Sequence, residues 1–339
     1  MWVTEAKPYL LSYMKIVVTG GAGFIGSNTC EAFINEGLEV ICLDNFLTGR
    51  RENITNLIES PLFTLVEGDI RNLEDCKKAV EGADLVLHLA ALGSVPRSIV
   101  DPITTNNINI GGTLNMLVAA RDAGIKRFVY AASSSTYGDS EVLPKVENVI
   151  GRPLSPYAIT KYVSELYADV FGTTYGLDCI GLRYFNVFGR RQDPNGAYAA
   201  VIPKFAATLL QKESPVINGD GTFSRDFTYI DNVIQVNRLA LFTENKAALN
   251  EVYNVAFGDS STLNELYYEL RTNLSEYDSS ISTLEPIYGP NRKGDIPHSL
   301  ASIDKAKSLL GYDPKFSLKT GLKETVKWYW ENEVSLYNK

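Results

Sequence analysis

The chain has 339 residues, of which 45% are hydrophobic and 21% are charged, which is typical of a soluble globular protein with a full core and, we predict, two domains. Its net charge of -8 predicts no general attraction to nucleic acid or to anionic membranes. No apolar run reaches the ~18 residues of a membrane span, and the first residues lack the apolar stretch of a signal peptide. We therefore expect a cytoplasmic protein whose polyanionic ligands are small phosphorylated molecules held by a local basic site.

The cysteines and histidines argue against several kinds of chemistry. Cys30, Cys42, Cys76 and Cys179 have no C-x-x-C spacing and lie in apolar segments, so we expect buried, reduced thiols. His88 and His298 are the only histidines, which leaves little basis for a zinc site or a Ser-His-Asp triad, and we predict no metal. His88 is interpreted as a packed core histidine, with a role in catalysis as the alternative.

A glycine-rich loop near the start predicts a dinucleotide site. The β-branched run 15–19 leads into Gly20-Gly21-Ala22-Gly23-Phe24-Ile25-Gly26, and an amphipathic helix (29–36) and a second strand (39–43) ending at Asp44 follow. Such glycines let the backbone approach a pyrophosphate, and the acidic residue can accept the ribose hydroxyls. Asn45, which is not a cation, favours NAD over NADP, although Arg50 and Arg51 lie nearby; an unliganded glycine turn is the other interpretation.

Alternating strands and helices continue through the first half of the chain. Strand-like runs occur at 64–67, 85–89, 127–130 and 179–183, with helical stretches between them at 73–80, 113–123 and 156–175. This alternation predicts a doubly wound parallel sheet of the Rossmann type, with ligands beyond the carboxyl ends of the strands. Asp69-Ile70 and Leu89-Ala90-Ala91 follow two of these strands and suit the adenosine half of the cofactor.

Tyr157 and Lys161 are the predicted centre of the chemistry. Ser155 is a good helix N-cap and Pro156 a good first helical residue, so Tyr157 and Lys161, at positions i and i+4, share one helix face. A tyrosine beside an ammonium group can lose its proton near neutral pH. Because the serine run 133–135 ends the strand that precedes this helix, topology predicts that Ser133 joins the pair.

The pattern changes after about residue 184. A Gly/Pro/Asn-rich loop (190–196), a helix (201–210) and scattered arginines suggest a second anion site, with surface ion pairs as an equally plausible role for each arginine. We predict a cofactor domain at 14–184 with a returning segment near 229–256. A smaller C-terminal α/β substrate domain is predicted at 185–228 and 257–335. The apolar faces of helices 113–123 and 156–175 suggest a homodimer interface, or ordinary core packing.

These stretches together resemble the extended short-chain dehydrogenase/reductases, and specifically the nucleotide-sugar 4-epimerases. Long runs are similar to bacterial UDP-N-acetylglucosamine 4-epimerases of surface-polysaccharide pathways, and they lie at 91–98, 131–138 and 181–203. The resemblance extends from about Lys15 to the end of the chain. It implies NAD as the cofactor and a UDP-sugar as the substrate.

The resemblance also implies roles for individual residues. Those expected to bind NAD are Gly20, Gly23, Phe24, Ile25, Gly26, Asp44, Asn45, Thr48, Asp69, Ile70, Leu89, Ala90, Ala91, Tyr157, Lys161 and Tyr184. Those expected to bind the substrate are Ser94, Ser133, Ser134, Asn186, Ala200, Val201, Val216, Asn218, Arg225, Arg292, Asp295 and Ser299. Asn186, Arg225 and Arg292 would hold the diphosphate, and Asp295 the uridine ribose. Ile108 replaces a residue that is often polar in relatives, and it is left out of the site.

The implied reaction is a 4-epimerisation. Tyr157 would take the proton of the sugar 4-hydroxyl, Lys161 would lower the pKa of Tyr157, and Ser133 would hydrogen-bond the reacting oxygen. Related 4,6-dehydratases carry an Asp-Glu pair at the positions of Ser134 and Ser135, and decarboxylating relatives keep a Glu there. Without those acids, elimination lacks its proton donor. A non-catalytic binding protein is the remaining alternative.

The choice of sugar depends on the residue at position 299. Ser299 stands where many galactose-type bacterial enzymes carry tyrosine, so it leaves space for an N-acetyl group. We predict interconversion of UDP-GlcNAc and UDP-GalNAc, with UDP-Glc and UDP-Gal slower. N-acetylhexosaminuronic acid forms stay open, because Ser94 and Arg97 could meet a 6-carboxylate.

Overall fold

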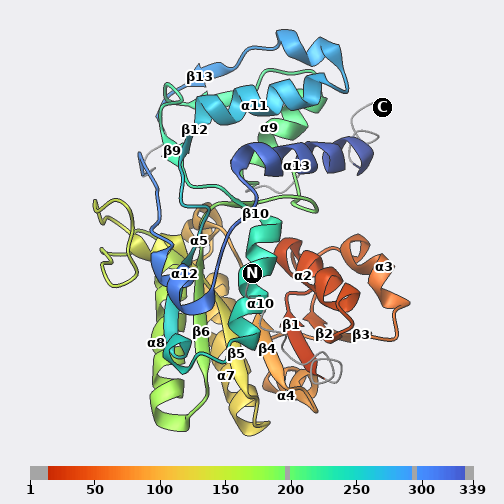
Figure 1. Ribbon diagram of the computed structural model, residues 1–339, viewed down its shortest axis with the longest axis vertical. Helices are drawn as coiled ribbons and strands as arrows, with labels where there is room; N and C mark the ends of the chain where they lie inside the picture. The colour runs from red at the N-terminus through yellow and green to blue at the C-terminus, as the bar shows by residue number, and fades with distance from the viewer. Residues whose placement is uncertain (1–13, 195–198, 292–295, 333–339) are drawn as a thin grey trace. The chain divides into compact units, whose positions relative to one another are not determined.

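The computed structural model describes residues 14–194, 199–291 and 296–332, and these residues form two compact units (Figure 1). The first unit comprises the described chain up to Thr136, Pro153–Arg183 and Val236–Tyr253. The second comprises Tyr137–Arg152, Tyr184–Gln235 and the described chain from Asn254 onward. Residues 137–152, which the sequence assigned to the cofactor domain, thus belong to the second unit.

A seven-stranded sheet forms the centre of the first unit, and it confirms the predicted fold class. Its strand order is β11-β6-β5-β4-β1-β2-β3, and β1 pairs in parallel with both β2 and β4. The bounds are β1 Lys15–Thr19, β2 Glu39–Asp44, β3 Phe63–Glu67, β4 Leu85–His88, β5 Arg127–Ser133, β6 Cys179–Tyr184 and β11 Glu251–Val255. This crossover order places the ends of β1, β4 and β5 side by side, as the sequence predicted for ligand sites.

Helices α4 (Leu73–Val80), α7 (Thr113–Asp122) and α8 (Pro156–Tyr175) contribute to one apolar cluster with the sheet, which contains Met116, Leu117 and Phe171. Helix α2 (Phe24–Asn35) is tied to α10 (Ile230–Phe242) by a hydrogen bond of 3.4 Å from Asn237 to Thr29. The remaining elements are α3 (Thr55–Ile58), α5 (Val95–Val100), α6 (Pro102–Asn106), the π-helical turn η2 (Asn107–Gly112), and the 3-10 turns η1 (Arg51–Ile54), η3 (Ser134–Tyr137) and η4 (Lys246–Ala248). All four cysteines are buried and unpaired, as predicted.

The second unit contains short strands and amphipathic helices. Its strands form two-stranded sheets, in which β7 (Val187–Phe188) pairs with β10 (Thr228–Tyr229), β9 (Ser224–Arg225) with β12 (Ser261–Thr262), and β8 (Val216–Asn218) with β13 (Ile287–Gly289). Its helices are α9 (Val201–Leu210), α11 (Leu263–Ser275), α12 (Asp304–Leu310) and α13 (Leu318–Asn332), with the 3-10 turn η5 (Ser279–Thr283). Phe205 of α9 packs edge-on against Tyr267 of α11, at 6.3 Å between ring centroids.

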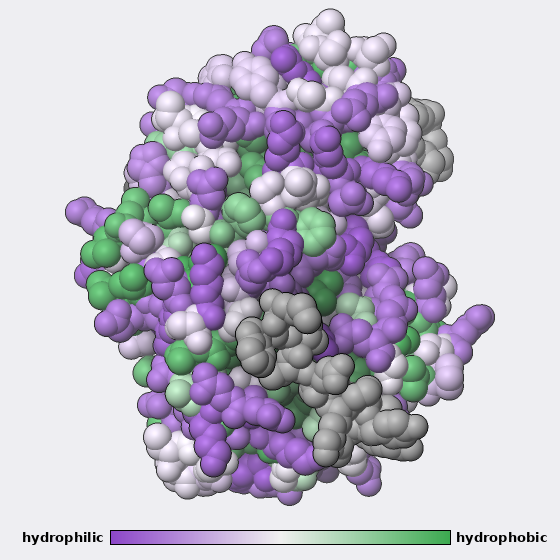
Figure 2. Space-filling model, viewed as in Figure 1, coloured by the Kyte–Doolittle hydropathy of each residue, from purple (hydrophilic) through white to green (hydrophobic). Residues whose placement is uncertain are grey.

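Figure 2 shows a largely hydrophilic surface with separate apolar patches. Among the described residues, no helix combines the length and the hydropathy needed to span a bilayer.

Candidate active site

The first turns of α8 place Tyr157 and Lys161 as the sequence predicted. The hydroxyl of Ser155 accepts a hydrogen bond of 3.1 Å from the Ala158 amide, and Pro156 is the first helical residue. This cap fixes the start of the helix, so the residues at i and i+4 lie on one face. The Lys161 ammonium group lies 5.9 Å from the Tyr157 ring centroid and donates to the Ala131 carbonyl at 2.8 Å.

Ser133 is the last residue of β5, and as a hydrogen-bonding neighbour its side chain lowers the pKa of Tyr157. Burial raises the pKa of Tyr157 above its usual range, and the Ser133 hydrogen bond acts in the opposite direction. Since a hydroxyl that donates to a phenolate stabilises it, Ser133 is the neighbour that favours ionised Tyr157. The structure therefore brings together the three side chains to which the sequence assigned the chemistry.

Lys161 is almost fully buried, and burial lowers its pKa to about 8, while the charge of Glu165 acts to raise it. Glu165 accepts hydrogen bonds of 2.9 and 2.7 Å from Arg183, forming a buried, bidentate ion pair. Glu165 was not predicted as a functional residue, although its position one helical turn after Lys161 was a usable signal.

The glycine loop has the shape that a pyrophosphate site requires. Gly20 has a φ of +68°, and a Cβ added to it would lie 2.9 Å from the backbone of Ala90. A Cβ on Gly26 would lie 2.1 Å from the Gly20 carbonyl oxygen, so neither position tolerates a side chain. The loop ends at Gly23, from which α2 begins, and the helix N-terminus favours an anion.

Asp44 at the end of β2 is held ready to accept further hydrogen bonds. One of its carboxylate oxygens accepts the Ala22 amide at 2.9 Å and the other accepts the Phe46 amide at 2.8 Å. Burial raises its pKa, and these backbone hydrogen bonds oppose that shift. Each oxygen keeps acceptor capacity for a ribose hydroxyl, so Asp44 and the glycine loop fit an adenine dinucleotide.

The two arginines that could bind the 2'-phosphate of NADP, Arg50 and Arg51, both lie beside carboxylates. Arg51 donates to Glu67 at 3.0 and 2.6 Å, and its guanidinium lies 4.0 Å from the Phe46 ring centroid. Arg50 lies 3.8 Å from Glu52. Asn45 donates to Asp69 at 2.8 Å, which joins two predicted cofactor residues. Both arginines of the loop after β2 thus lie beside carboxylates of the same unit.

His88 is buried, as predicted, within a hydrogen-bond network that determines its tautomer. The Thr19 hydroxyl accepts the Leu89 and Ala90 amides, both at 3.1 Å, so its proton is directed to Nδ1 of His88 at 2.7 Å. The other ring nitrogen, Nε2, then donates to Thr113 at 3.0 Å. Burial, with a smaller contribution from the Lys161 charge, lowers the pKa of His88 to about 3. A neutral His88 thus fixes the backbone at Leu89 and Ala90.

The other predicted residues of the first unit occupy varied positions. Phe24 and Ile25 open α2, Ile70 is buried, Ala91 is half-buried and Thr48 is exposed. Tyr184, the first residue of a segment of the second unit, is buried. Ser94 caps α5 by accepting the Arg97 amide at 3.2 Å. Ile108, omitted from the predicted site, is buried in the apolar cluster.

Asn186 and Arg225 lie close to each other in the backbone of the second unit. Asn186 has a φ of +35° and donates to the Asp226 carbonyl at 2.9 Å. Arg225 donates to the carbonyls of Ser224 and Pro297, at 2.8 and 3.1 Å. Asp226, which the sequence analysis missed, is fully buried and accepts the backbone amides of 257, 258 and 301.

Three further predicted substrate residues are solvent-exposed, namely Ala200, Val216 and Asn218, and Val201 opens α9. Ser299 is half-buried, and its amide donates to the Ser224 carbonyl at 3.1 Å, which brings it next to the β9 strand that carries Arg225. Arg292 and Asp295 lie outside the described residues.

With this geometry in place, the family model described as "NAD dependent epimerase/dehydratase family" matches residues 16–256, well over half of the chain. The chain belongs to this family. NAD is therefore its cofactor, in agreement with the sequence prediction.

Individual members of the epimerase/dehydratase family extend the comparison. A putative UDP-glucose 4-epimerase of Methanocaldococcus jannaschii is 38% identical over 94% of this chain and 99% of its own length. The UDP-N-acetylglucosamine 4-epimerase of Methanobrevibacter ruminantium, solved with UDP-N-acetylmuramic acid, is 40% identical with a TM-score of 0.86, covering 94% of this chain and 98% of the relative. The Thermotoga maritima UDP-glucose 4-epimerase, solved with UDP-glucose, is 38% identical with a TM-score of 0.85, covering 94% and 99%.

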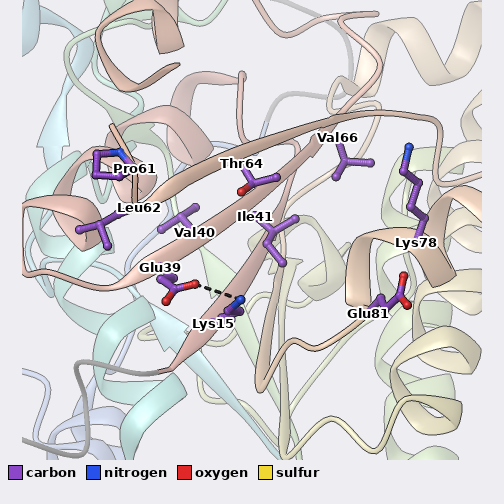
Figure 3. Close-up of a pocket in the computed structure, with 10 residues that line it drawn as sticks. All are labelled: Lys15, Glu39, Val40, Ile41, Pro61, Leu62, Thr64, Val66, Lys78 and Glu81. Atoms are coloured by element: carbon purple, nitrogen blue, oxygen red, sulfur yellow. Dashed lines mark ion pairs between the residues drawn. The ribbon is translucent and has the colours of Figure 1, made fainter. Parts of the chain in front are cut away.

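Away from these residues, a hollow of about 360 Å³ lies near the starts of strands β1, β2 and β3 (Figure 3). It is lined by Lys15, Glu39, Val40, Ile41, Pro61, Leu62, Thr64, Val66, Lys78 and Glu81, and Lys15 pairs with Glu39 at 3.2 Å. None of these is a predicted site residue, and ligands of doubly wound sheets bind at the opposite, carboxyl ends.

In the part of the chain that the structure describes, no group of three or more His, Cys, Asp or Glu side chains could hold a metal.

Proposed function

We propose that the chain is a UDP-sugar 4-epimerase whose preferred reaction interconverts UDP-GlcNAc and UDP-GalNAc. The observation that carries the proposal is the grouping of Ser133 at the end of β5 with Tyr157 and Lys161 on one face of α8, where the Lys161 ammonium lies 5.9 Å from the Tyr157 ring. Membership of a family with UDP-sugar 4-epimerases among its similar relatives supports the reaction class.

The chain's own residues would handle the proton of the reaction. Ionised Tyr157 takes the proton of the sugar 4-hydroxyl, and Ser133 donates a hydrogen bond to the oxygen that carries negative charge. Lys161, still largely an ammonium at neutral pH, favours the phenolate and is suited to the nicotinamide ribose. The glycine loop, Asp44 and Lys161 would hold NAD, which would supply the hydride transfer to and from C4 of the sugar.

The serine run favours epimerisation over elimination. The positions where related dehydratases carry an acid pair hold Ser134 and Ser135, and the Ser135 hydroxyl lies 2.9 Å from that of Ser133. A serine hydroxyl is far too weak an acid to protonate a leaving hydroxide at neutral pH. The 4-keto intermediate is therefore expected to be reduced again without losing a group.

Residues of the second unit are proposed to bind the UDP moiety and select the sugar. The Arg225 guanidinium suits a diphosphate oxygen, Asn186 is its neighbour, and Arg292 and Asp295 are assigned by resemblance. Ala200, Val201, Val216 and Asn218 are proposed for the uracil. Ser299, smaller than tyrosine by an aromatic ring, supports an N-acetylated sugar.

The test is incubation of the NAD-loaded protein with UDP-GlcNAc, UDP-Glc and an N-acetylated UDP-uronate, with products separated by chromatography. We expect kcat/KM to be highest for the UDP-GlcNAc pair, with no stoichiometric accumulation of NADH. A 4-keto-6-deoxy or decarboxylated product would contradict the epimerase. A preference for the uronate would keep the reaction class and replace the substrate.

We also propose a homodimer through α8. Ile159, Leu166 and Val170 lie on this helix with about half of their surface exposed, at 50%, 49% and 49%. Ile99 and Ile103 on the neighbouring helices α5 and α6 are 63% and 73% exposed. Sedimentation velocity should show a dimer that Leu166→Glu dissociates, and a monomeric wild-type protein would refute this interface.

A further inference from the structure

Ser135 makes two contacts with the hydroxyl oxygen of Ser133. Its own hydroxyl donates at 2.9 Å and its backbone amide donates at 3.2 Å. The strand β5 ends at Ser133 and the 3-10 turn η3 begins at Ser134, so the turn folds residue 135 back over residue 133. No role for Ser135 follows from the sequence beyond its lack of an acid group.

These two contacts use the acceptor capacity of Ser133. A hydroxyl oxygen has two lone pairs and one proton. With the Ser135 hydroxyl and amide occupying both lone pairs, only the proton of Ser133 is left for a further partner. That proton is left free to point towards Tyr157, whose pKa Ser133 lowers, as expected of a hydrogen-bond donor.

We infer that Ser135 is a positioning residue that commits Ser133 to donating a hydrogen bond, so that the proton of the sugar 4-hydroxyl passes directly to Tyr157. This inference rests on the proposed epimerase function. In the forward step the O–H and C4–H bonds of the sugar break and a C4=O bond forms. The proton goes to the Tyr157 oxygen and the hydride to NAD, and both return in the second half-reaction.

The alternative route, a relay through Ser133, is disfavoured by the same geometry. In a relay, Ser133 would accept the sugar proton while passing its own proton to Tyr157. It would need a lone pair facing the sugar, and one of the two Ser135 hydrogen bonds would have to break first. Breaking a single hydrogen bond in this way would slow the step roughly tenfold.

The first experiment compares wild type, Ser135→Ala and Ser135→Thr in the NAD-loaded enzyme across pH. Removing the Ser135 hydroxyl should move the acid limb of the kcat profile up by about half a pH unit to one pH unit and lower kcat at pH 7 about 3- to 10-fold. KM should stay unchanged, and Ser135→Thr should restore the profile. Ser164→Ala is the matched control, since it deletes a buried hydroxyl of α8 that bonds only the Thr160 carbonyl among the contacts found in the described chain.

A uniform loss of kcat at every pH, with the limb unmoved, would overturn the positioning role. A double-mutant comparison adds a second check: in a Ser133→Ala background, Ser135→Ala should have no further effect on the limb. An undiminished effect there would show that Ser135 does not act through Ser133.

The direct proton route has its own test. Ser133→Ala should retain clearly more activity than Tyr157→Phe, because Tyr157 can still take the proton, whereas equal losses would indicate a relay. The phenolate difference absorbance of NAD-loaded protein against Tyr157→Phe measures the Tyr157 pKa without turnover. If no UDP-sugar is epimerised, the proposed function fails, yet this titration still decides whether Ser135 controls Ser133.

Discussion

The two units differ in how they hold their functional side chains. In the first, Ser133 ends a seven-residue strand and Tyr157 and Lys161 lie on the 20-residue helix α8. In the second, Arg225 lies on a two-residue strand and Asn186 adopts a left-handed backbone conformation with a φ of +35°. Long, buried elements fix distances between side chains, whereas short strands and turns can change with little effect on a core.

This difference separates reaction from substrate. The proton-transferring groups need a constant geometry, and the first unit provides it through the cap at Ser155 and the buried contact of Lys161 with Ala131. The groups that distinguish one UDP-sugar from another need only local changes, such as the residue at position 299. We therefore expect mutations in the first unit to change kcat and mutations in the second to change KM or the preferred sugar.

The largest effect is expected for Tyr157→Phe. The substitution removes the oxygen that takes the proton with little change in volume, so kcat should fall about 10²- to 10⁴-fold, while NAD content and the melting temperature stay near those of wild type. Steady-state kinetics on the NAD-loaded protein measure this. A folded variant with normal kcat would reject the first unit as the site of proton transfer.

A smaller effect, of a different kind, is expected for Arg225→Ala. Loss of a charge-assisted hydrogen bond to the diphosphate should raise KM about 10- to 100-fold with kcat nearly unchanged. The matched control is Arg238→Ala, which deletes an arginine of α10 that forms an ion pair with Glu36 at 2.7 Å. If kcat fell and KM did not, the division of labour between the units would be wrong.

The sequence predicted the long helices and strands of both units better than the two- and three-residue strands of the second, for the same physical reason. The helix α8 and the strand β1 of the first unit and the helix α9 of the second were predicted with their observed bounds, because caps, β-branched runs and periodic apolar positions act locally. The carboxylates of Asp226 and Glu165 and the hydroxyl of Ser135 were missed as functional neighbours, since their roles depend on backbone amides or side chains brought close only by the fold. The two-residue strands of the second unit leave no periodicity to detect.

Ser299→Tyr should sharpen the comparison from the side of specificity. An aromatic ring at this half-buried position should reduce kcat/KM for UDP-GlcNAc relative to UDP-Gal by about tenfold, within the range of 10- to 200-fold that a pocket wall can provide. Competition between the two substrates in one reaction gives the ratio directly. An unchanged ratio would mean that position 299 does not contact the 2-substituent.

The last prediction concerns one buried titratable group in each unit. Burial lowers the pKa of His88 to about 3 and raises the pKa of Asp226 to about 7 against the opposing hydrogen bonds of its backbone amides. Below about pH 6.5 the unfolded chain takes up a proton at His88 that the folded first unit does not, so this group reduces stability as the pH falls towards 3. Asp226 has the opposite sign: between about pH 4 and 7 the folded second unit binds the extra proton, so its contribution is lost as the pH rises through 7.

The contributions of His88 and Asp226 to stability oppose each other between about pH 4 and 6.5. A variant that removes one of these groups should therefore make the pH dependence of the other visible. Urea unfolding at pH 5, 6 and 7 gives the free energy of unfolding of each variant. As the pH is lowered, this free energy should increase in His88→Gln relative to wild type, and it should decrease in Asp226→Asn relative to wild type. Each slope should change by up to about 1.4 kcal/mol per pH unit. If the two units unfold in separate transitions, the pH dependence of each transition is assigned to its own unit. The control is His298→Gln, which removes an exposed histidine. Parallel slopes in wild type and His88→Gln would show that His88 titrates normally in the folded protein.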